Sequence, residues 1–387
     1  MTLNKNSLFK IAILSALPAI SIQASELNYL YKDQRIMAMG GTNISVGGYS
    51  SSLFSNPAGI AKVSKNDDLI IELFTIQASG GKDTAPFISD LNDAIDTDDR
   101  FEVAKTIANY SGKSIHVDAS NYSSMTQNSG QYAWSLGLLT ALDANLTPYA
   151  DEVEIQARTY SGLTSALTYT FKPSRAGELS IGFGLKAITQ QSYEGVLTAA
   201  ELIFEDDITG KIENDLQNDG VAVSADLGFI YQLNRNMKPS FGMSILNIGE
   251  LDFNDHYGSQ PMTVNFGASI QPELFFSKHT IIAIDYVDAL NASKTRYYDS
   301  SNGRFASSTE SNDVEDRLRI GISARLFENK WSALDLATGV YQGAYTAGFT
   351  YTATIFRIGF TTYEEGVNSL HSTETDRRYN LSASITW

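Results

Sequence analysis

Long stretches of strict two-residue alternation dominate the chain from residue 113 onward and most constrain its fold. In the last stretch, residues 378–387, aliphatic and aromatic side chains share one face, while polar side chains share the other. Residues 179–190 and 221–233 repeat this pattern. The stretches exceed the ~5–6 residues of a common soluble strand and reach the ~9–11 residues that a membrane-spanning strand needs. The pattern therefore predicts transmembrane β-strands.

The alternating segments number about fourteen, an even count, as expected for a bacterial outer-membrane barrel. We expect strands at residues 67–79, 113–126, 131–144, 153–171, 178–192, 220–233, 238–249, 261–271, 278–289, 313–327, 331–341, 344–352, 355–364 and 376–387. The fold class is thus all-β: an antiparallel transmembrane barrel of ~14 strands. Soluble sandwiches have shorter strands, and no period of 20–50 residues indicates a solenoid.

Short and long connections alternate along the chain. Short turns are expected near residues 128–130, 172–177, 234–237, 272–277, 328–330 and 352–354, and long loops at 80–112, 194–219, 290–312 and 366–375. In outer-membrane barrels the short turns are periplasmic and the long loops are extracellular. The pattern therefore predicts that both chain ends lie at the periplasmic rim.

Two of the long loops contain helical spacing. Phe87, Leu91 and Ile95 recur every four residues, and a second such segment follows the acidic run 96–99. We therefore expect a pair of helices in the extracellular loop 80–112. Residues 197–204 form another short amphipathic patch.

The first 24 residues resemble a secretory signal. Lys5 and Lys10 precede a short apolar core at 11–22, and a small-residue cleavage site follows it. Removing these two lysines would take the net charge from −16 to −18, which argues against nucleic acid as a partner. The chain has no Cys, so disulfides do not stabilise it. We expect export to the outer membrane of a Gram-negative bacterium, with outer-membrane lipid and the barrel-assembly machinery as partners.

If the aliphatic faces meet lipid, the opposite faces place charged side chains in the lumen. These are Lys186, Asp226, Asp285, Arg317, Arg319, Arg325, Asp335, Arg357 and Arg378. A charge in a narrow lumen needs a partner or water. Pairing between neighbouring strands, such as Arg325 with Asp335, is one interpretation. The other is that the arginines, for example Arg317 or Arg357, hold Asp33 or backbone carbonyls of an N-terminal plug.

The sequence gives little support for catalysis. His116, His256, His279 and His371 are scattered without metal-ligand spacing, so we expect no metal and no cofactor. No GxSxG motif, Walker loop or EF-hand is present. A barrel hydrolase would need a nucleophile beside a histidine, and 116–118 is the nearest candidate. We predict that the protein is not an enzyme.

Residues 25–66 lack membrane alternation and precede the barrel, 67–387. They include Met39, Gly40 and Gly41 and, further on, Asn56, Pro57, Ala58 and Gly59. Asn56 is suited to cap a helical turn and Pro57 to begin one. Glycine permits tight turns in a narrow lumen. A simple linker turn and a plug inside the barrel are both compatible with these residues.

A Met-Gly-Gly, a polar spacer and Asn-Pro-Ala-Gly resemble the plug of FadL-type hydrophobic-compound channels and of the related PorV-like and TraF-like proteins. Segments 222–233, 241–253 and 261–270 resemble mid-barrel strands of this superfamily, and the C-terminal segments are most similar to the TraF-like branch. The resemblance implies a 14-stranded barrel with an inserted plug. The aromatic C-terminal residue, Trp387, suits recognition by assembly machinery.

Three functions remain open from the sequence. The first is passage of small hydrophobic ligands through a plugged channel. The second is a non-conducting accessory role in a conjugation or protein-secretion apparatus, with transfer or secretion proteins as partners. The third is a structural or adhesive surface barrel. A bulged wall strand beside the plug would favour the first, and a continuous wall around a filled lumen would favour the others.

Overall fold

The computed structural model describes residues 29–64, 66–172, 176–204, 210, 212, 215–254, 256–275, 277, 279–299, 302–309, 314–368 and 373–387. The predicted signal at 1–24 and the first residues of the predicted segment 25–66 lie outside this range. So does His371.

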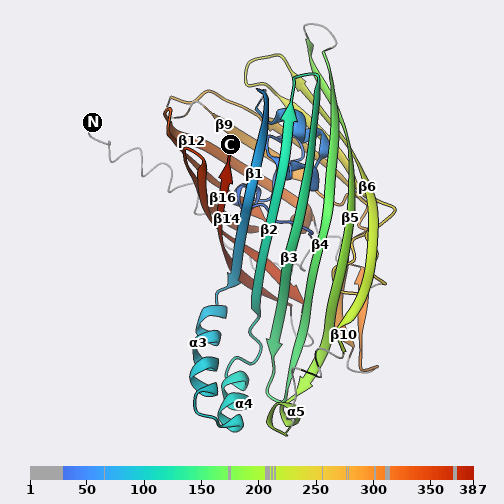
Figure 1. Ribbon diagram of the computed structural model, residues 1–387, viewed down its shortest axis with the longest axis vertical. Helices are drawn as coiled ribbons and strands as arrows, with labels where there is room; N and C mark the ends of the chain where they lie inside the picture. Colours follow the sequence, from blue (N-terminus) through green and yellow to red (C-terminus); the bar gives the residue numbers. More distant parts are fainter. Residues whose placement is uncertain are drawn as a thin grey trace, which may run out of the picture.

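Fourteen antiparallel strands form a closed barrel, which confirms the predicted fold class (Figure 1). The strands are β1 (Asn66–Gly81), β2 (Ile115–Asn128), β3 (Tyr132–Pro148), β4 (Glu152–Phe171), β5 (Gly177–Thr198), β6 (Gln217–Leu233), β7 (Ser240–Ile248), β8 (Thr263–Ile270), β9 (Thr280–Tyr286), β12 (Leu318–Glu328), β13 (Ser332–Tyr341), β14 (Ala344–Ala353), β15 (Phe356–Asn368) and β16 (Thr373–Thr386). Each pairs with its neighbour in chain order, except that β9 pairs with β12.

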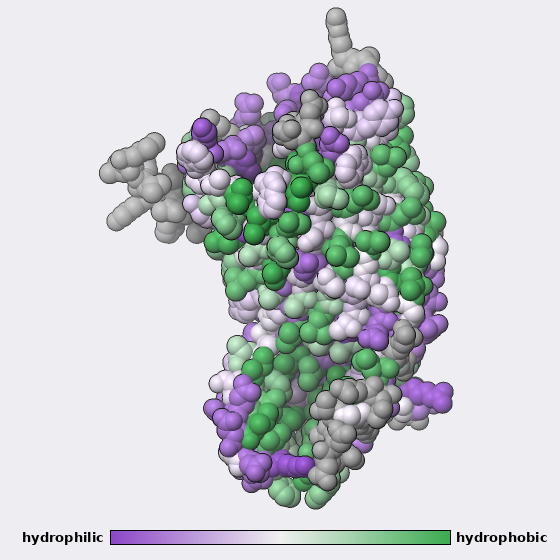
Figure 2. Space-filling view, in the orientation of Figure 1, coloured by the Kyte–Doolittle hydropathy of each residue, from purple (hydrophilic) through white to green (hydrophobic). Residues whose placement is uncertain are grey.

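Pairing between β1 and β16 closes the barrel. The closure extends to the C-terminal residue, because the backbone groups of Ile71 and Trp387 exchange two hydrogen bonds of 2.8 and 3.1 Å. On the face shown in Figure 2, apolar side chains cover much of the middle of the wall, and hydrophilic ones gather towards its two ends. This distribution suits a wall whose middle band faces lipid.

The wall is much taller on one side than on the other. Strands β3–β6 have 17 to 22 residues, whereas β7–β9 have 7 to 9. Since ~9–11 residues suffice to cross a membrane, the tall side continues beyond the membrane band on the long-loop side. The predicted bounds of the loop 194–219 are therefore wrong at both ends. The loop is shorter, because β5 continues to Thr198 and β6 begins at Gln217.

The loop 80–112 contains the predicted helix pair, α3 (Thr84–Ile95) and α4 (Arg100–Ala108). Phe87 and Ile107 from these helices pack with Ile115 and Val153 at the tips of the tall wall. A short helix, α5 (Ala199–Phe204), occupies the predicted patch 197–204. No helix among the described residues combines the length and the apolar character needed to cross a membrane.

Two loop-side elements differ from the sequence predictions. The predicted loop 290–312 contains a separate hairpin, β10 (Lys294–Asp299) and β11 (Arg304–Thr309). The predicted strand 313–327 starts later, because α7 (Val314–Arg317) precedes β12. Arg317 therefore lies on a helical turn, where its guanidinium donates to the Asp288 carbonyl at 2.6 Å and contacts Asn291.

Inside the barrel lies the chain from Tyr29 to Ser64, which we call the inserted segment. It contains α2 (Gln34–Ala38) and two 3₁₀ helices, η2 (Ser50–Phe54) and η3 (Pro57–Lys62). Leu53 and Ile60 are fully buried and pack with inward-facing wall residues such as Leu139 and Ile188. The main apolar core thus lies between this segment and the tall wall.

Candidate functional site

The inserted segment crosses the lumen from the loop side to the turn side. At its start, Arg158 and Tyr160, on the loop-side half of β4, donate to the carbonyls of Tyr29 and Leu30 at 3.1 and 2.7 Å. At its end, Asn128 beside a short turn donates to the carbonyls of Ala61 and Val63. The C-terminal residue lies at the turn rim as predicted. The first described residue instead lies on the loop side.

Asn56 fixes the second half of the segment to the tall wall. Its side chain accepts from the Ala58 amide at 3.0 Å, which is the predicted cap of a helical turn begun by Pro57. The same fully buried amide group donates to Ile44 O at 2.7 Å and to Phe229 O and Met243 O at 3.2 and 3.3 Å. These two carbonyls belong to β6 and β7. Asn56 is thus a wall anchor as well as a cap.

Gln34 fixes the first half to the opposite wall in a similar way. Its side-chain amide donates to Phe349 O and Phe360 O at 3.1 and 2.9 Å, on β14 and β15. It also donates to Thr361, whose hydroxyl lies 2.9 Å from Gln34 O. The Gln34 backbone amide donates to Gln77 on β1. Gln34 could not be predicted from the sequence, because a single glutamine in a polar run gives no local signal.

Inward-facing glycines on eight strands make room for the segment. A Cβ at any of them would approach an atom of the inserted segment more closely than 3.0 Å; they are Gly182, Gly228, Gly242, Gly267, Gly321, Gly339, Gly348 and Gly359. Gly228 faces the Asn56 side chain and Gly359 faces that of Gln34. The two amide anchors therefore enter notches in the wall. The glycines on the polar faces of the strands were the sequence signal for this contact.

The Met39-Gly40-Gly41 motif forms a tight turn against β12, β13 and β14. Gly40 and Gly41 have φ of +66° and +79°, which L-residues with a Cβ rarely adopt. Met39 is 1% exposed. The Gly40 amide donates to Thr346 on β14 at 3.0 Å. The motif therefore places the chain close to the wall where a side chain would not fit.

Wall carboxylates hold the segment, rather than the predicted arginines. Asp285 on β9 accepts from the backbone amides of Asn43 and Ile44 at 2.7 and 2.9 Å. Glu72 on β1 accepts from Ser50 and lies 3.7 Å from the Arg35 guanidinium. Backbone amides near a turn are donors, so an acceptor on the wall satisfies them and an arginine does not.

The expected contacts of Arg317 and Arg357 with the segment are accordingly wrong. Arg357 pairs with Glu72 at 2.7 Å, and Arg317 bonds loop residues. Asp33 pairs with Arg35 of its own helix at 2.7 Å and accepts from Ser51 at 2.5 Å.

The remaining lumen charges lie on inward faces and have partners. Lys186 is 3.0 Å from Asp226 and 2.6 Å from Asn247. Arg325 and Asp335 form the ion pair that the sequence suggested, at 2.8 Å. Arg319 donates to Asp316 O at 2.7 Å and stacks on the Tyr341 ring, with its guanidinium carbon 4.0 Å from the ring centroid. Desolvation of these charges is thus offset by local contacts.

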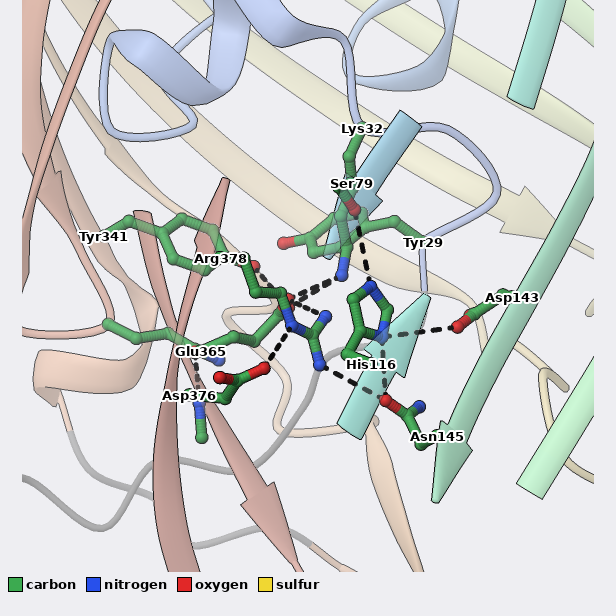
Figure 3. A network of polar contacts seen from close by, with 12 residues as sticks. Tyr29, Lys32, Ser79, His116, Asp143, Asn145, Tyr341, Glu365, Asp376 and Arg378 are labelled. Carbon is green, nitrogen blue, oxygen red and sulfur yellow. Dashed lines mark hydrogen bonds and ion pairs between the residues drawn. The ribbon is translucent and has the colours of Figure 1, made fainter. Parts of the chain in front are cut away.

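An ionic cluster clamps the start of the segment to β15 and β16 (Figure 3). Lys32 of the segment and Arg378 of β16 both bind Glu365 of β15, at 2.8 and 2.5 Å. Tyr341 donates to the same carboxylate at 3.1 Å, and Asp376 lies 3.6 Å from Arg378. Glu365 is fully buried, so the two cations offset the desolvation cost of its charge.

His116 joins this cluster from β2 (Figure 3). Its Nδ1 lies 2.7 Å from Asn145 Oδ1 and 3.9 Å from Asp143, and its Nε2 lies 3.5 Å from Ser79 Oγ. The order Ser–His–Asn resembles that of a hydrolase triad. However, the adjoining void is only about 20 Å³, the space of a single water, so no substrate fits beside it. The arrangement is a polar contact between β1, β2 and β3.

Two cavities lie on opposite sides of α2. The first, about 120 Å³, opens on the loop side, and Leu30, Ile36, Met37, Ile44 and Phe54 are among its lining residues. Wall residues Leu246, Val287 and Lys186 complete it. The second, about 430 Å³, lies on the turn side and has Arg35, Glu72, Arg325 and Arg357 in its lining. Helix α2 thus separates a largely apolar cavity, whose lining also includes Lys32, Asp33, Lys186 and Asp288, from a more polar one.

No protein-family model and no curated protein matches this chain in sequence. Solved structures do match in fold. The TodX deltaS2S3 mutant monoaromatic hydrocarbon channel superposes with a TM-score of 0.53 at 12% identity, over 92% of this chain and 98% of that chain. The TodX monoaromatic hydrocarbon channel deltaS2 mutant gives 0.53 at 11% identity, over 93% and 99%.

The toluene transporter TbuX of Ralstonia pickettii gives a TM-score of 0.48 at 13% identity, over 93% of this chain and 98% of that chain. At such identities the similarity concerns architecture. The chain shares the closed fourteen-stranded barrel fold of the two TodX channel structures.

Proposed function

We propose that this protein is an outer-membrane channel that binds and passes small hydrophobic ligands, with the predicted segment 25–66 as its plug. The observation that carries the proposal is the apolar cavity of about 120 Å³ between the inserted segment and the wall. A cavity of ~150 Å³ lined by apolar side chains holds benzene in another protein. A ligand with one aromatic ring therefore matches this cavity in size and in polarity.

Strand β1 supports the same reading. Its register with both neighbours shifts near Leu73, and Phe74 has a φ of 52° and an exposed fraction of 59%. Glu72, which directly precedes Leu73, contacts the inserted segment. A bulge beside the segment is the feature that favours a ligand channel over a continuous wall around a filled lumen.

The fold relatives add a plausible ligand class. Both TodX structures are described as monoaromatic hydrocarbon channels. The alternative, an accessory role in conjugation or secretion like TraF-like or PorV-like proteins, has no feature of the site in its favour and remains a hypothesis. The same proposal includes two further roles. Assembly machinery recognises Trp387, and the outer wall contacts lipid.

The experiment is uptake of radiolabelled toluene by cells that produce the protein. Ile36→Trp would fill much of the cavity, so we expect uptake to fall towards that of cells without the protein. The matched control is Ile358→Trp, at a lipid-facing position that is 50% exposed. Both variants should reach the membrane in equal amount. Wild-type uptake in Ile36→Trp, or no uptake above background in the wild type, would contradict the proposal.

A further inference from the structure

The hairpin β10–β11 lies across the loop-side end of the lumen. Its chain leaves the wall between β9 and β12, where Asp288 and Ser293, just before β10, line the apolar cavity. From this base the hairpin contacts β15 on one side and reaches the loop-side end of β5 on the other (Figure 1). These two strands stand on nearly opposite sides of the closed sheet. A hairpin that touches both therefore passes over the lumen, next to the mouth of the cavity.

The hairpin is attached to the barrel by side chains rather than by a backbone ladder. Its two strands form a sheet of their own, separate from the barrel. The rings of Tyr298 and Phe305, with centroids 5.3 Å apart, pack against each other within the hairpin. None of its described residues is among the buried apolar residues of the core. Because a two-stranded hairpin is only marginally stable by itself, this one can detach from its contacts without disturbing the wall.

An ion pair joins the hairpin to the far wall. Arg296 of β10 binds both carboxylate oxygens of Glu194 on β5, at 2.9 and 2.5 Å. The two side chains are 11% and 6% exposed. His256, in the loop between β7 and β8, lies 3.7 Å from the same carboxylate. Glu194 therefore meets the hairpin and a second loop at one point on the loop side.

The second loop is itself fixed to the wall. Gln190 on β5 donates to Tyr257 O at 2.7 Å, and Arg158 on β4 donates to Gly258 O at 3.3 Å. These contacts hold the backbone beside His256 in place. Of the two elements that meet Glu194, the hairpin is thus the one that is free to move.

Burial makes this ion pair a reversible contact. The cost of removing both charges from water offsets much of their attraction in the closed position. When the hairpin lifts, water replaces the lost partner of each charge. If one charge is removed by substitution, the other is left buried without it in the closed position only. Such a substitution therefore favours the open position.

We propose that the hairpin β10–β11 is a lid over the apolar cavity and that the ion pair between Glu194 and Arg296 holds it closed. The lid controls entry of the ligand from the loop side. For this role the inference rests on the proposed channel function, whereas the closure itself can be tested without any ligand.

The test measures how fast a thiol inside the cavity reacts with a reagent from outside. The chain contains no Cys, so Ile36→Cys introduces a single thiol, and Ile36 lines the cavity. A charged, water-soluble methanethiosulfonate is added to the purified full-length protein in detergent micelles. In this background Glu194→Gln and Arg296→Gln should each speed modification by about tenfold, the size of one lost hydrogen bond between charged groups.

The matched control is Glu364→Gln in the same background. Glu364 pairs with Arg377 at 2.7 Å, also near the loop side, but this pair joins the neighbouring wall strands β15 and β16. Its loss should leave the modification rate unchanged. Exchange of the two charges, Glu194→Arg with Arg296→Glu, should restore the slow rate. Heat-modifiability on gels shows which variants are folded.

An unchanged rate in folded Glu194→Gln and Arg296→Gln, or the same increase in Glu364→Gln, would overturn the lid. Fast modification of the variant with exchanged charges would overturn the assignment of closure to this ion pair. Thiol modification needs no transport. Absence of toluene uptake in the wild type would therefore contradict the channel proposal while leaving the result for the lid in place.

Discussion

The two halves of the inserted segment are held by similar anchors but lie in different surroundings. Asn56 and Gln34 each bond carbonyls of two adjacent strands through a glycine notch. Around Asn56, fully buried Leu53 and Ile60 continue the apolar core. Around Gln34 the apolar packing is limited to a small cluster of Met37, Tyr341 and Tyr363, beside ion pairs and two cavities.

This difference indicates which half can move. Close-packed apolar contacts resist displacement, whereas a short helix with a cavity on each side loses little packing when it shifts. We therefore expect α2 to open and close the lumen while η3 stays fixed. Each prediction below tests this contrast.

Deletion of residues 27–63, with the signal kept, should have the largest effect. It removes both halves and leaves a barrel with an open polar lumen, so single-channel conductance in planar bilayers should rise strongly. Heat-modifiability on gels would check that the barrel still folds. A folded deletion variant with the conductance of the intact protein would mean that the segment does not obstruct the lumen.

Substitution of the notch glycines should have the second largest effect and should distinguish the two halves of the segment. Gly182→Val places carbon against the backbone of Pro57 and Ala58, which cannot move aside, and should lower the free energy of unfolding by about 1–3 kcal/mol. Gly359→Val meets the end of the Gln34 side chain, which can rotate away, and should cost less. Urea titration measures both. A larger loss in Gly359→Val would reverse the assignment of the rigid half.

Removal of each anchor amide gives the most direct comparison. Asn56→Ala should lower the free energy of unfolding by about 0.5–2 kcal/mol with little change in conductance, because the apolar core still holds η3. Gln34→Ala should raise the conductance more, because only a small cluster of Met37, Tyr341 and Tyr363 packs around α2. Paired bilayer recordings and urea titrations provide the measurement. Equal conductance in the two variants would argue against a mobile α2.

Thr42→Val should have the smallest effect. The Thr42 hydroxyl donates to Met39 O at 2.8 Å between the two halves, and that carbonyl keeps a second bond from the Thr42 amide. We expect a loss of about 1 kcal/mol or less by urea titration and no change in conductance. A clear rise in conductance would identify this turn as part of the moving unit.

Much of the wall follows from local sequence pattern. Alternation over ten or more residues decides which face of a strand meets lipid, and each strand carries that information within itself. Each of the fourteen predicted segments therefore corresponds to a wall strand, and the largest differences at strand ends, in β5 and β12, lie on the loop side. The capped turn at Asn56 and Pro57 is equally local. The same reasoning missed the β10–β11 hairpin, since its short strands lack long alternation.

The contacts of the site could not be predicted in this way, because they join residues that are far apart in the chain. Gln34 meets Phe349 and Phe360 across more than 300 residues, and no pattern near Gln34 signals them. Asp285 holds the segment because it is an acceptor placed opposite the amides of Asn43 and Ile44, and Glu72 accepts from the Ser50 hydroxyl. The arginine that does contact the segment, Arg158, donates to the Tyr29 carbonyl and is not one of the predicted residues.

By itself, the sequence determined the strands, their outward-facing sides and the helical turn at Asn56, because these depend on residues within a few positions of one another. Only the tertiary structure decided where the segment lies, which glycines receive it and which charges pair. Those outcomes depend on closing the sheet, which brings β1 and β16 together and gives every inward side chain neighbours from distant strands.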